Sequence, residues 1–392
     1  MADTLKGFFS PELVRRLAGD LARVDGSFPV RAFTRDASAG LDKLELLARA
    51  KHIAGALAKH LPADYPRAVE VLLRSLGPEL EGDELLGVGI APFFYLPHLV
   101  FIAERGLAHI ELSLRAQYEI TKRCSAESSI RAFIAADPAQ TFAAFRRWAR
   151  DRNPHVRRLV SEGTRLRLPW AMRVAWLDAN PERVVELLEL LVDDPTTLVR
   201  RSVANNVNDL GKVHRDLMLR TCEGWLAAAS PERRALVEHA LRSAVKRGDR
   251  EAMRLLGYGA KPAVAIERVG FAPKRVAIGG RVAVSFVLRS TAKAPQELLV
   301  DLVVHFVKAN GKSAPKTFKL ERLSLPARGE TALASSISLA VHTTRKPQPG
   351  THRVEVAVNG YALPAGAFEV TADVARHSRH AAARRESRVK RE

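Results

Sequence analysis

The sequence repeats one helix-start signal at a regular spacing, and this constrains the fold more than any other feature. In five places between residues 137 and 231 a small polar residue stands directly before a proline and opens a stretch with helical apolar spacing. The polar side chain can cap the first turn, and proline needs no backbone donor there. The five starts are Asp137–Pro138, Asn153–Pro154, Asn180–Pro181, Asp194–Pro195 and Ser230–Pro231. Such repetition predicts a stack of similar helical units.

The spacing of these starts indicates the kind of unit. Asp137 and Asn180 lie 43 residues apart, and Asn153 and Asp194 lie 41 apart. A period of this length is typical of two-helix HEAT-type repeats. We therefore predict a mainly α protein in which an α-solenoid of HEAT-like repeats comes first.

The composition changes near residue 259. Before it, leucine and alanine recur at helical spacing, as in residues 67–76, 181–192 and 237–245. After it come short runs with the alternating pattern of strands, separated by turn-rich pieces. The runs are residues 281–290, 298–307, 317–325, 335–341 and 352–360. They predict a smaller all-β sandwich of roughly a hundred residues. The expected domains are 1–259 and 263–372, with Gly257, Gly259 and Pro262 in the linker and a basic, disordered tail over 373–392.

A second repeat overlays the helix starts. It is a basic pair, three residues, and then a polar or acidic residue: KRCSAE (122–127), RRLVSE (157–162), RRSVAN (200–205) and RRALVE (233–238). On a helix, Val156, Leu159 and Val160 would form the packing stripe, while Arg158 and Glu162 would share one flank. Stacked helices of this kind would present cations and acceptors along one face.

A simpler interpretation of these motifs is open. Arg123–Glu127, Arg158–Glu162 and Arg234–Glu238 have the spacing of ordinary surface ion pairs, each worth about 0.3–0.5 kcal/mol. Their recurrence favours a surface that follows phosphates, which needs cations at regular intervals. Trp148, Trp176 and Trp225 are core candidates, whereas Trp170 could lie in the core or on the surface.

The net charge indicates the class of binding partner, and the cysteine content indicates the cellular compartment. The formal net charge of +19 and the pI near 10.4 favour a polyanion, most often nucleic acid, although a ribosomal partner or anionic lipid would also fit. Cys124 and Cys222 show no disulfide or zinc-site spacing and are expected to be buried thiols in a reducing cytoplasm. No signal peptide or membrane span is expected, and the apolar run 88–103 is interpreted as core.

Four blocks of the helical part resemble the AlkC branch of the AlkC/AlkD family of DNA alkylation repair glycosylases. They are SLRAQYEITKRCSAESSIRAFI (113–134), NPHVRRLVSEGTRLRLPW (153–170), DDPTTLVRRSVANNVNDL (193–210) and VEHALRSAVKRGDREAMRLLGYG (237–259). The β-rich part, with KTFKLERLSL and HTTRKPQPGTHRVEVAVNG, resembles the immunoglobulin-like domain that some AlkC members carry.

The resemblance implies a monofunctional glycosylase that excises 3-methyladenine and 3-methylcytosine from double-stranded DNA without a base-binding pocket. It implies catalytic roles for Glu127, Glu162 and Asp209, and places Trp170 against the sugar of the lesion. In the third motif the position aligned with the acids is Asn205, and the acid comes one turn later at Asp209. The reach of Asp209 into the same site is therefore implied by the family and not by spacing.

The implied chemistry is reasonable for these residue types. A cationic alkylated base leaves without a general acid, so the barrier lies in the sugar, which becomes oxocarbenium-like. A nearby carboxylate stabilises that charge and can orient a water molecule. An indole face adds cation–π stabilisation.

The phosphate-binding candidates are basic residues of the repeats, of the segment before the linker and of the β-rich part. They are Arg123, Arg158, Arg201, Lys246, Arg247, Lys312 and Arg345. Arg158 is expected to hold a phosphate that flanks the lesion. Lys312 and Lys316 are expected on turns, from which they could reach phosphates. The alternative, equally favoured, is that these turns are solvated loops of an interaction module.

The sequence predicts no metal, no cofactor and a monomer. The competing hypothesis is a non-catalytic HEAT-type module that binds nucleic acid or scaffolds a partner, because solenoid folds often serve such roles. A hydrolase or metalloenzyme has little support, since the sequence shows no nucleophile elbow, P-loop or ligand spacing. The expected location is the bacterial cytoplasm, at the nucleoid.

Overall fold

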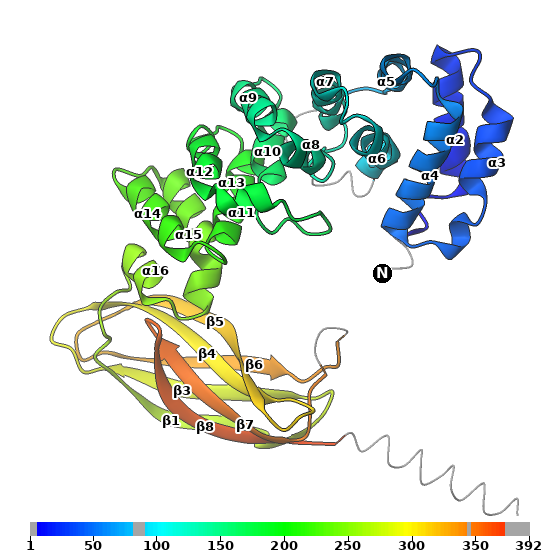
Figure 1. Cartoon of the computed structure of the whole chain (residues 1–392). Coiled ribbons are helices and arrows are strands. Elements are labelled where there is room, and N and C mark those ends of the chain that lie inside the picture. The colour runs from blue at the N-terminus through cyan, green and yellow to red at the C-terminus, as the bar shows by residue number, and fades with distance from the viewer. Residues whose placement is uncertain (1–5, 81–90, 343–345, 373–392) are drawn as a thin grey trace, which may run out of the picture. The chain divides into compact units, whose positions relative to one another are not determined.

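The computed structural model describes residues 6–80, 91–342 and 346–372 (Figure 1). The chain divides into two compact units, Met1–Leu241 and Arg242–Glu392. The first is helical, and the second holds the end of the last long helix, one short helix and all the strands. The predicted order, mainly α followed by a smaller all-β domain, is confirmed.

The described helices follow one another along the first unit and into the start of the second (Figure 1). The α-helices are α2 (Pro11–Val24), α3 (Val30–Ser38), α4 (Leu46–His60), α5 (Tyr65–Arg74), α6 (Leu96–Arg105), α7 (Ile110–Thr121), α8 (Ile130–Ala136), α9 (Pro138–Trp148), α10 (Pro154–Gly163), α11 (Ala175–Ala179), α12 (Pro181–Glu189), α13 (Thr197–Leu210), α14 (Arg215–Leu226), α15 (Pro231–Lys246) and α16 (Arg250–Leu255). Two 3₁₀ turns are η1 (Leu41–Lys43) and η2 (Ala91–Tyr95).

The predicted helix starts are correct in four of five cases. Helices α9, α10, α12 and α15 each begin at the predicted proline. Asp137 and Asn153 cap their helices, accepting from the backbone N–H groups of Gln140 and His155 at 2.9 Å. The fifth prediction is wrong, because α13 begins at Thr197, two residues after Pro195. Asp194 instead accepts from the backbone N–H of Thr196 within the preceding turn.

The apolar stripe predicted for α10 faces the core. Val156, Leu159 and Val160 are fully buried, as are Val199, Val203 and Val207 at four-residue spacing on α13. Helices α10 and α13 pack directly on each other. This contact brings residues about 40 positions apart in the chain to one place, and the candidate site depends on it.

One buried ion pair ties these repeats together. The Nε and Nη2 atoms of Arg157 donate to the carboxylate of Asp194 at 2.5 and 3.0 Å, and Nη1 donates to the carbonyl of Asp151. Arg200, the equivalent residue of the next motif, donates in the same way to the carbonyls of Asp194 and Pro195. Arg157 therefore joins α10 to the turn before α13, whereas Arg200 holds the turn that precedes its own helix.

The β part forms a sandwich of two sheets. The strands are β1 (Val264–Ala272), β2 (Arg275–Ala277), β3 (Arg281–Ser290), β4 (Gln296–Val307), β5 (Ser313–Leu325), β6 (Glu330–Ser338), β7 (Gly350–Val358) and β8 (Tyr361–Thr371). One sheet has the order β1-β3-β6 and the other β2-β8-β7-β4-β5. Alternate residues of β3 and β7 face a shared apolar core. The prediction of a sandwich is confirmed, although three of its strands were not predicted.

The structure also tests the expectations for the cysteines, for the apolar run 88–103 and for membrane-spanning helices. Cys124 and Cys222 are buried free thiols, and burial raises the pKa of each to about 12. Within the run 88–103, residues 88–90 lie outside the described residues, and Leu99, Phe101 and Ile102 are buried. None of the described helices is long and apolar enough to cross a membrane.

The Arg157–Asp194 pair predicts a measurable stability difference. Asp194→Ala leaves a partly buried guanidinium without its carboxylate, so we expect the free energy of unfolding to fall by about 3 kcal/mol. Glu186→Ala removes an exposed partner of Arg183 and should cost less than about 1 kcal/mol. Urea unfolding followed by circular dichroism measures both. Equal losses would contradict a structural role for the buried pair.

Candidate active site

Three carboxylates and three cations form a continuous chain of ion pairs in the helical unit. The acids come from the turn before α8, from α10 and from α13, and each is linked to the next by an arginine. In order, the chain runs Glu127, Arg158, Glu162, Arg165, Asp209 and Lys212. The structure thus brings together the three acids that the family resemblance implied.

Arg158 links the first two acids. Its Nη1 donates to Oε2 of Glu127 at 3.1 Å, and its Nη2 lies 3.5 Å from Oε1 of Glu162. The contact of Arg158 with Glu162 is the predicted one, because these residues stand one turn apart on α10. The contact of Arg158 with Glu127 crosses from α10 to the turn before α8, and sequence spacing did not predict it.

Arg165 links the second acid to the third. Its Nη1 donates to Oε2 of Glu162 at 3.0 Å, and its Nε donates to Oδ2 of Asp209 at 2.8 Å. Burial alone would lower the pKa of Arg165, but the two carboxylates raise it above its ordinary value. Lys212 completes the chain by donating to Oδ1 of Asp209 at 2.6 Å.

The acids differ in their access to solvent. The side chain of Glu127 is 28 % exposed, whereas those of Glu162 and Asp209 are 4 % and 1 % exposed. The arginines are also largely covered, at 15 % for Arg158 and 14 % for Arg165. Glu162 and Asp209 therefore lie beneath their cations.

Local packing fixes the arrangement of α10 against α13. The amide nitrogen of Asn206 donates to the carbonyl of Ser161 at 2.8 Å and to the hydroxyl of Thr164 at 3.0 Å. Asn206 is fully buried, and so is Thr164 at the end of α10. The asparagines between 205 and 208 are thus part of helix α13, and Asn206 holds Glu162 and Asp209 at a fixed separation.

Trp170 lies in the loop that follows α10. The residue is 71 % exposed, and its backbone has φ of 59°. A non-glycine residue in this left-handed region is uncommon and costs energy, so surrounding contacts must hold it there. Of the two places open to it, Trp170 takes the surface. Trp148 and Trp225 are buried, and Trp176 is half-buried and packs its ring on Phe142.

A buried arginine that the sequence did not single out holds this loop. Arg131 on α8 is 1 % exposed and donates to the carbonyls of Gly163, Arg165 and Met172 at 2.7 to 2.9 Å. Burial lowers the pKa of Arg131 to about 10, so it stays charged at neutral pH. The three carbonyls bracket the segment that carries Arg165 and Trp170. Arg131 therefore positions both.

The structure separates the predicted phosphate-binding residues into two groups. Arg123 is only 14 % exposed and donates to the carbonyls of Gly77 and Glu119 at 2.8 Å. The predicted Arg123–Glu127 pair is wrong, because α7 ends at Thr121 and Arg123 turns back toward Glu119.

The other basic candidates are at the surface. Arg201, Lys246, Arg247 and Lys312 are all exposed. Lys312 lies in the turn between β4 and β5, as predicted, but Lys316 lies within strand β5 and not on a turn. Arg345 lies outside the described residues. Among the candidates that the structure describes, Arg158 is the one that it joins to the acids.

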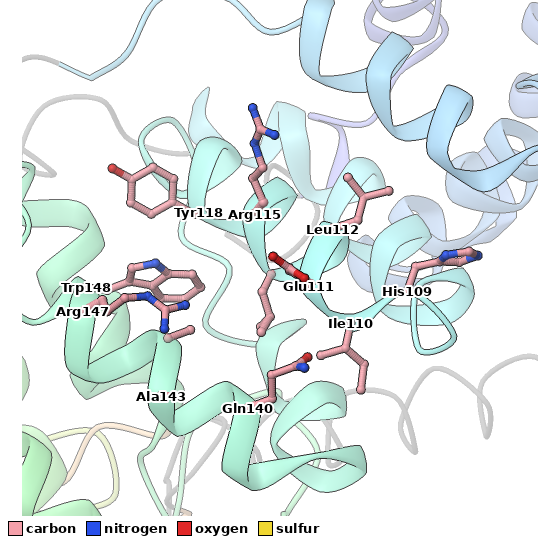
Figure 2. A pocket seen from close by; sticks show the side chains of 12 residues that line it. His109, Ile110, Glu111, Leu112, Arg115, Tyr118, Gln140, Ala143, Arg147 and Trp148 are labelled. Carbon is pink, nitrogen blue, oxygen red and sulfur yellow. The ribbon is translucent and has the colours of Figure 1, made fainter.

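A cavity of about 700 Å³ lies elsewhere, between α7 and α9 (Figure 2). Its lining includes Arg115, Tyr118, Arg147 and Trp148, and none of the three acids. The acid chain is therefore no part of this hollow. Across the described residues, no group of His, Cys, Asp or Glu side chains could hold a metal ion.

The Arg131 contacts predict a local effect on the loop after α10. Arg131→Met removes three charge-assisted hydrogen bonds, so we expect a loss of about 3 kcal/mol in the free energy of unfolding and faster tryptic cleavage at Arg173. Arg147→Met, at an exposed position of α9, is the control and should change neither. Unchanged cleavage at Arg173 in folded Arg131→Met would contradict the positioning role.

Known proteins are similar to this one over nearly the whole chain. The structure is similar to that of Pseudomonas fluorescens alkylpurine DNA glycosylase AlkC bound to DNA containing an abasic site analog, at 36 % identity and a TM-score of 0.86. That match covers 94 % of this chain and 99 % of the other. The uncharacterized protein YhaZ of Bacillus subtilis (strain 168) is 31 % identical over 376 residues, which are 94 % of this chain and all of YhaZ.

The β part has its own match. Residues 265–372 fit the sequence model of the family described as the C-terminal Ig-like domain of the uncharacterised protein YhaZ. Because relatives at 31 % and 36 % identity span almost its full length, the chain belongs to the AlkC branch of the AlkC/AlkD family of DNA alkylation repair glycosylases, with a C-terminal immunoglobulin-like domain.

Proposed function

We propose that this protein is a monofunctional DNA glycosylase that releases cationic N-alkylated bases, 3-methyladenine and 3-methylcytosine, from double-stranded DNA. The observation that carries the proposal is the convergence of Glu127, Glu162 and Asp209 in a chain similar to AlkC throughout its length. The protein would work as a monomer in the bacterial cytoplasm, at the nucleoid, with no metal or cofactor.

The reaction needs little help at the base. The C1′–N bond breaks with its electron pair passing to the cationic base, which leaves as a neutral molecule. Positive charge then develops on C1′ and the ring oxygen of the sugar. Water adds to C1′ and loses one proton. A carboxylate beside the sugar lowers this barrier by opposing the developing charge and by accepting the proton of the water.

Glu162 is the best placed of the three acids for this role. Oε2 of Glu162 is held by Arg165 at 3.0 Å, while Oε1 lies 3.5 Å from Arg158, beyond a good hydrogen bond. Oε1 is therefore the oxygen with capacity for a new partner. Glu127 is the most exposed acid and would face the DNA first, and Asp209 would act mainly by holding Arg165 toward Glu162.

DNA would change the charge balance of the cluster. In the free protein the three carboxylates are matched by Arg158, Arg165 and Lys212. A phosphate that draws Arg158 away leaves Glu127 and Glu162 undercompensated beside the sugar. The acids would then stabilise the developing sugar cation only where the DNA backbone is bound. Backbone recognition would in this way be coupled to catalysis.

The exposed indole of Trp170 would supply a flat surface, in the loop that follows the helix of Glu162. An aromatic face stabilises a cationic nucleotide through its quadrupole. Trp170 has a left-handed backbone and is exposed to solvent, so the indole is accessible to a nucleotide. This arrangement suits contact with the sugar of a nucleotide that stays in the duplex, without a base-binding pocket.

The alternative is a non-catalytic module that binds nucleic acid or scaffolds a partner. The basic surface residues fit either role. The buried carboxylates favour the enzyme, because acids repel phosphates and a pure DNA-binding surface has no use for three of them. The release of bases from methylated DNA distinguishes the two.

The roles of the acids predict a specific kinetic defect. Glu162→Gln keeps the shape but removes the charge, so we expect single-turnover release of 3-methyladenine and 3-methylcytosine to fall by about 10²-fold. Binding to undamaged DNA should stay within about twofold. Glu186→Gln, at an exposed position of α12, is the matched control. Release by Glu162→Gln at the normal rate would favour the non-catalytic alternative.

Arg158 predicts a different pattern. If it binds one phosphate, Arg158→Ala should weaken binding to both damaged and undamaged DNA and reduce the slope of log K against log salt by about 0.9. Excision should fall as well, since Glu127 and Glu162 lose their shared cation. Fluorescence anisotropy over a salt series measures the slope. A slope equal to that of the wild type would show that Arg158 does not contact phosphate.

A further inference from the structure

The second unit contains a cavity that takes no part in the proposed reaction. It has a volume of about 460 Å³ and lies between the segment at the end of α15 and the five-stranded sheet. The segment contributes residues from Val245 to Met253, and β4, β5, β7 and β8 contribute the opposite wall. Both walls belong to the unit Arg242–Glu392.

Specific contacts fix the two walls against each other. The hydroxyl of Thr317 on β5 donates to the carbonyl of Lys246 at 3.1 Å. The amide of Asn359 donates to the carbonyl of Ala260 at 3.4 Å, and the guanidinium of Arg250 lies 4.6 Å from the centre of the Tyr361 ring. The cavity is therefore bounded by packed structure on each side.

One charged side chain in this cavity has an unmet hydrogen bond. Asp301 on β4 is 4 % exposed, and its Oδ1 has no hydrogen-bond partner. A buried carboxylate without partners is costly, and native proteins seldom keep one without a reason. Burial raises the pKa of Asp301, while the charges of Lys319, Lys246 and Arg322 oppose that shift. A ligand that donates hydrogen bonds would remove the cost.

The surroundings define the chemistry of such a ligand. A carboxylate only accepts, so the ligand must present N–H or O–H donors to Asp301. A cationic ligand is disfavoured, because the positive charges of Lys319, Lys246 and Arg322 already act on the acid and oppose the rise in its pKa. Val245, Met253, Val303 and Pro315 offer apolar walls suited to a flat ring. Lys246 and Arg247 line the cavity and are exposed, so they can meet an anion at its mouth.

We propose that this cavity binds a guanine nucleotide. Neutral guanine carries two adjacent N–H donors on one edge, which match a carboxylate in a bidentate pair, and its phosphate would reach Lys246 and Arg247. Adenine offers an acceptor at the equivalent ring position, which would face Asp301 unfavourably. The same chemistry is available from a free nucleotide or from an unpaired guanosine in DNA. The inference does not depend on base excision.

The test compares mononucleotides on the full-length protein. Isothermal titration calorimetry should show dGMP binding at least about tenfold more tightly than dAMP. In Asp301→Asn the new amide donates toward the ligand, so dGMP affinity should fall by at least about tenfold and xanthosine 5′-monophosphate should bind better than dGMP. Equal binding of dGMP and dAMP by the wild type, or unchanged dGMP binding by Asp301→Asn, would overturn the proposal.

Controls separate this result from misfolding and from failure of the enzyme. Asp301→Asn removes a buried charge, so its thermal midpoint should equal or exceed that of the wild type, and its gain of xanthosine monophosphate binding requires a folded site. Glu321→Gln, at an exposed position of β5, should bind dGMP normally. Excision of 3-methyladenine by Asp301→Asn is measured in parallel and reports on the other unit separately.

A second arm identifies the source of the nucleotide. Duplexes with a single-stranded overhang ending in guanosine or in adenosine are compared by anisotropy. A preference for the guanosine overhang that disappears in Asp301→Asn assigns the site to DNA. A preference seen only with mononucleotides assigns it to free guanine nucleotide, and absence of preference in both arms refutes the site.

Discussion

The double ion pair of Arg165 is the contact on which the candidate site depends. It joins Glu162 on α10 to Asp209 on α13, so two acids 47 residues apart in the chain share one guanidinium. Two carboxylates this deeply buried would repel each other and pay a large desolvation cost without a cation between them. The same arginine lies in the loop that Arg131 holds by its carbonyls. The packing of α8, α10 and α13 and the charge of the site are therefore one arrangement.

The features that could be predicted from the sequence are those that depend on residues close together in the chain, such as helix starts and strands. Capping residues and prolines gave four helix starts, and alternating runs gave five of the strands. Strand β8 was not predicted, because Pro364 and Gly366 interrupt its pattern; the register with β7 shifts between Val354 and Glu355, next to them. The start of α13 was misplaced because Asp194 serves Arg157 and not the helix cap.

The same division applies to the site. Arg158 and Glu162 are one turn apart and could be paired from spacing alone, whereas Arg123 and Glu127 have the same spacing but lie beyond the end of α7. The link from Arg158 to Glu127 and that from Arg165 to Asp209 join different repeats, and a motif read within one repeat cannot contain them. Arg131 gave no sequence signal, because an arginine beside apolar residues resembles a surface residue until its burial is seen.

The low exposure of two of the three acids explains how a basic protein that attracts phosphates can also contain carboxylates at its candidate site. Glu162 and Asp209 are nearly closed off, and the most exposed members of the cluster are Lys212 and Glu127. Long-range attraction of DNA is thereby kept, because each acid is masked at short range by a cation. Glu162 and Asp209 each have two cationic partners, whereas Glu127 has one, Arg158, and is the most exposed of the three acids. If the DNA backbone draws Arg158 from the cluster, as proposed, the site becomes negative only on bound DNA, and the stabilisation of a sugar cation would be confined to bound DNA.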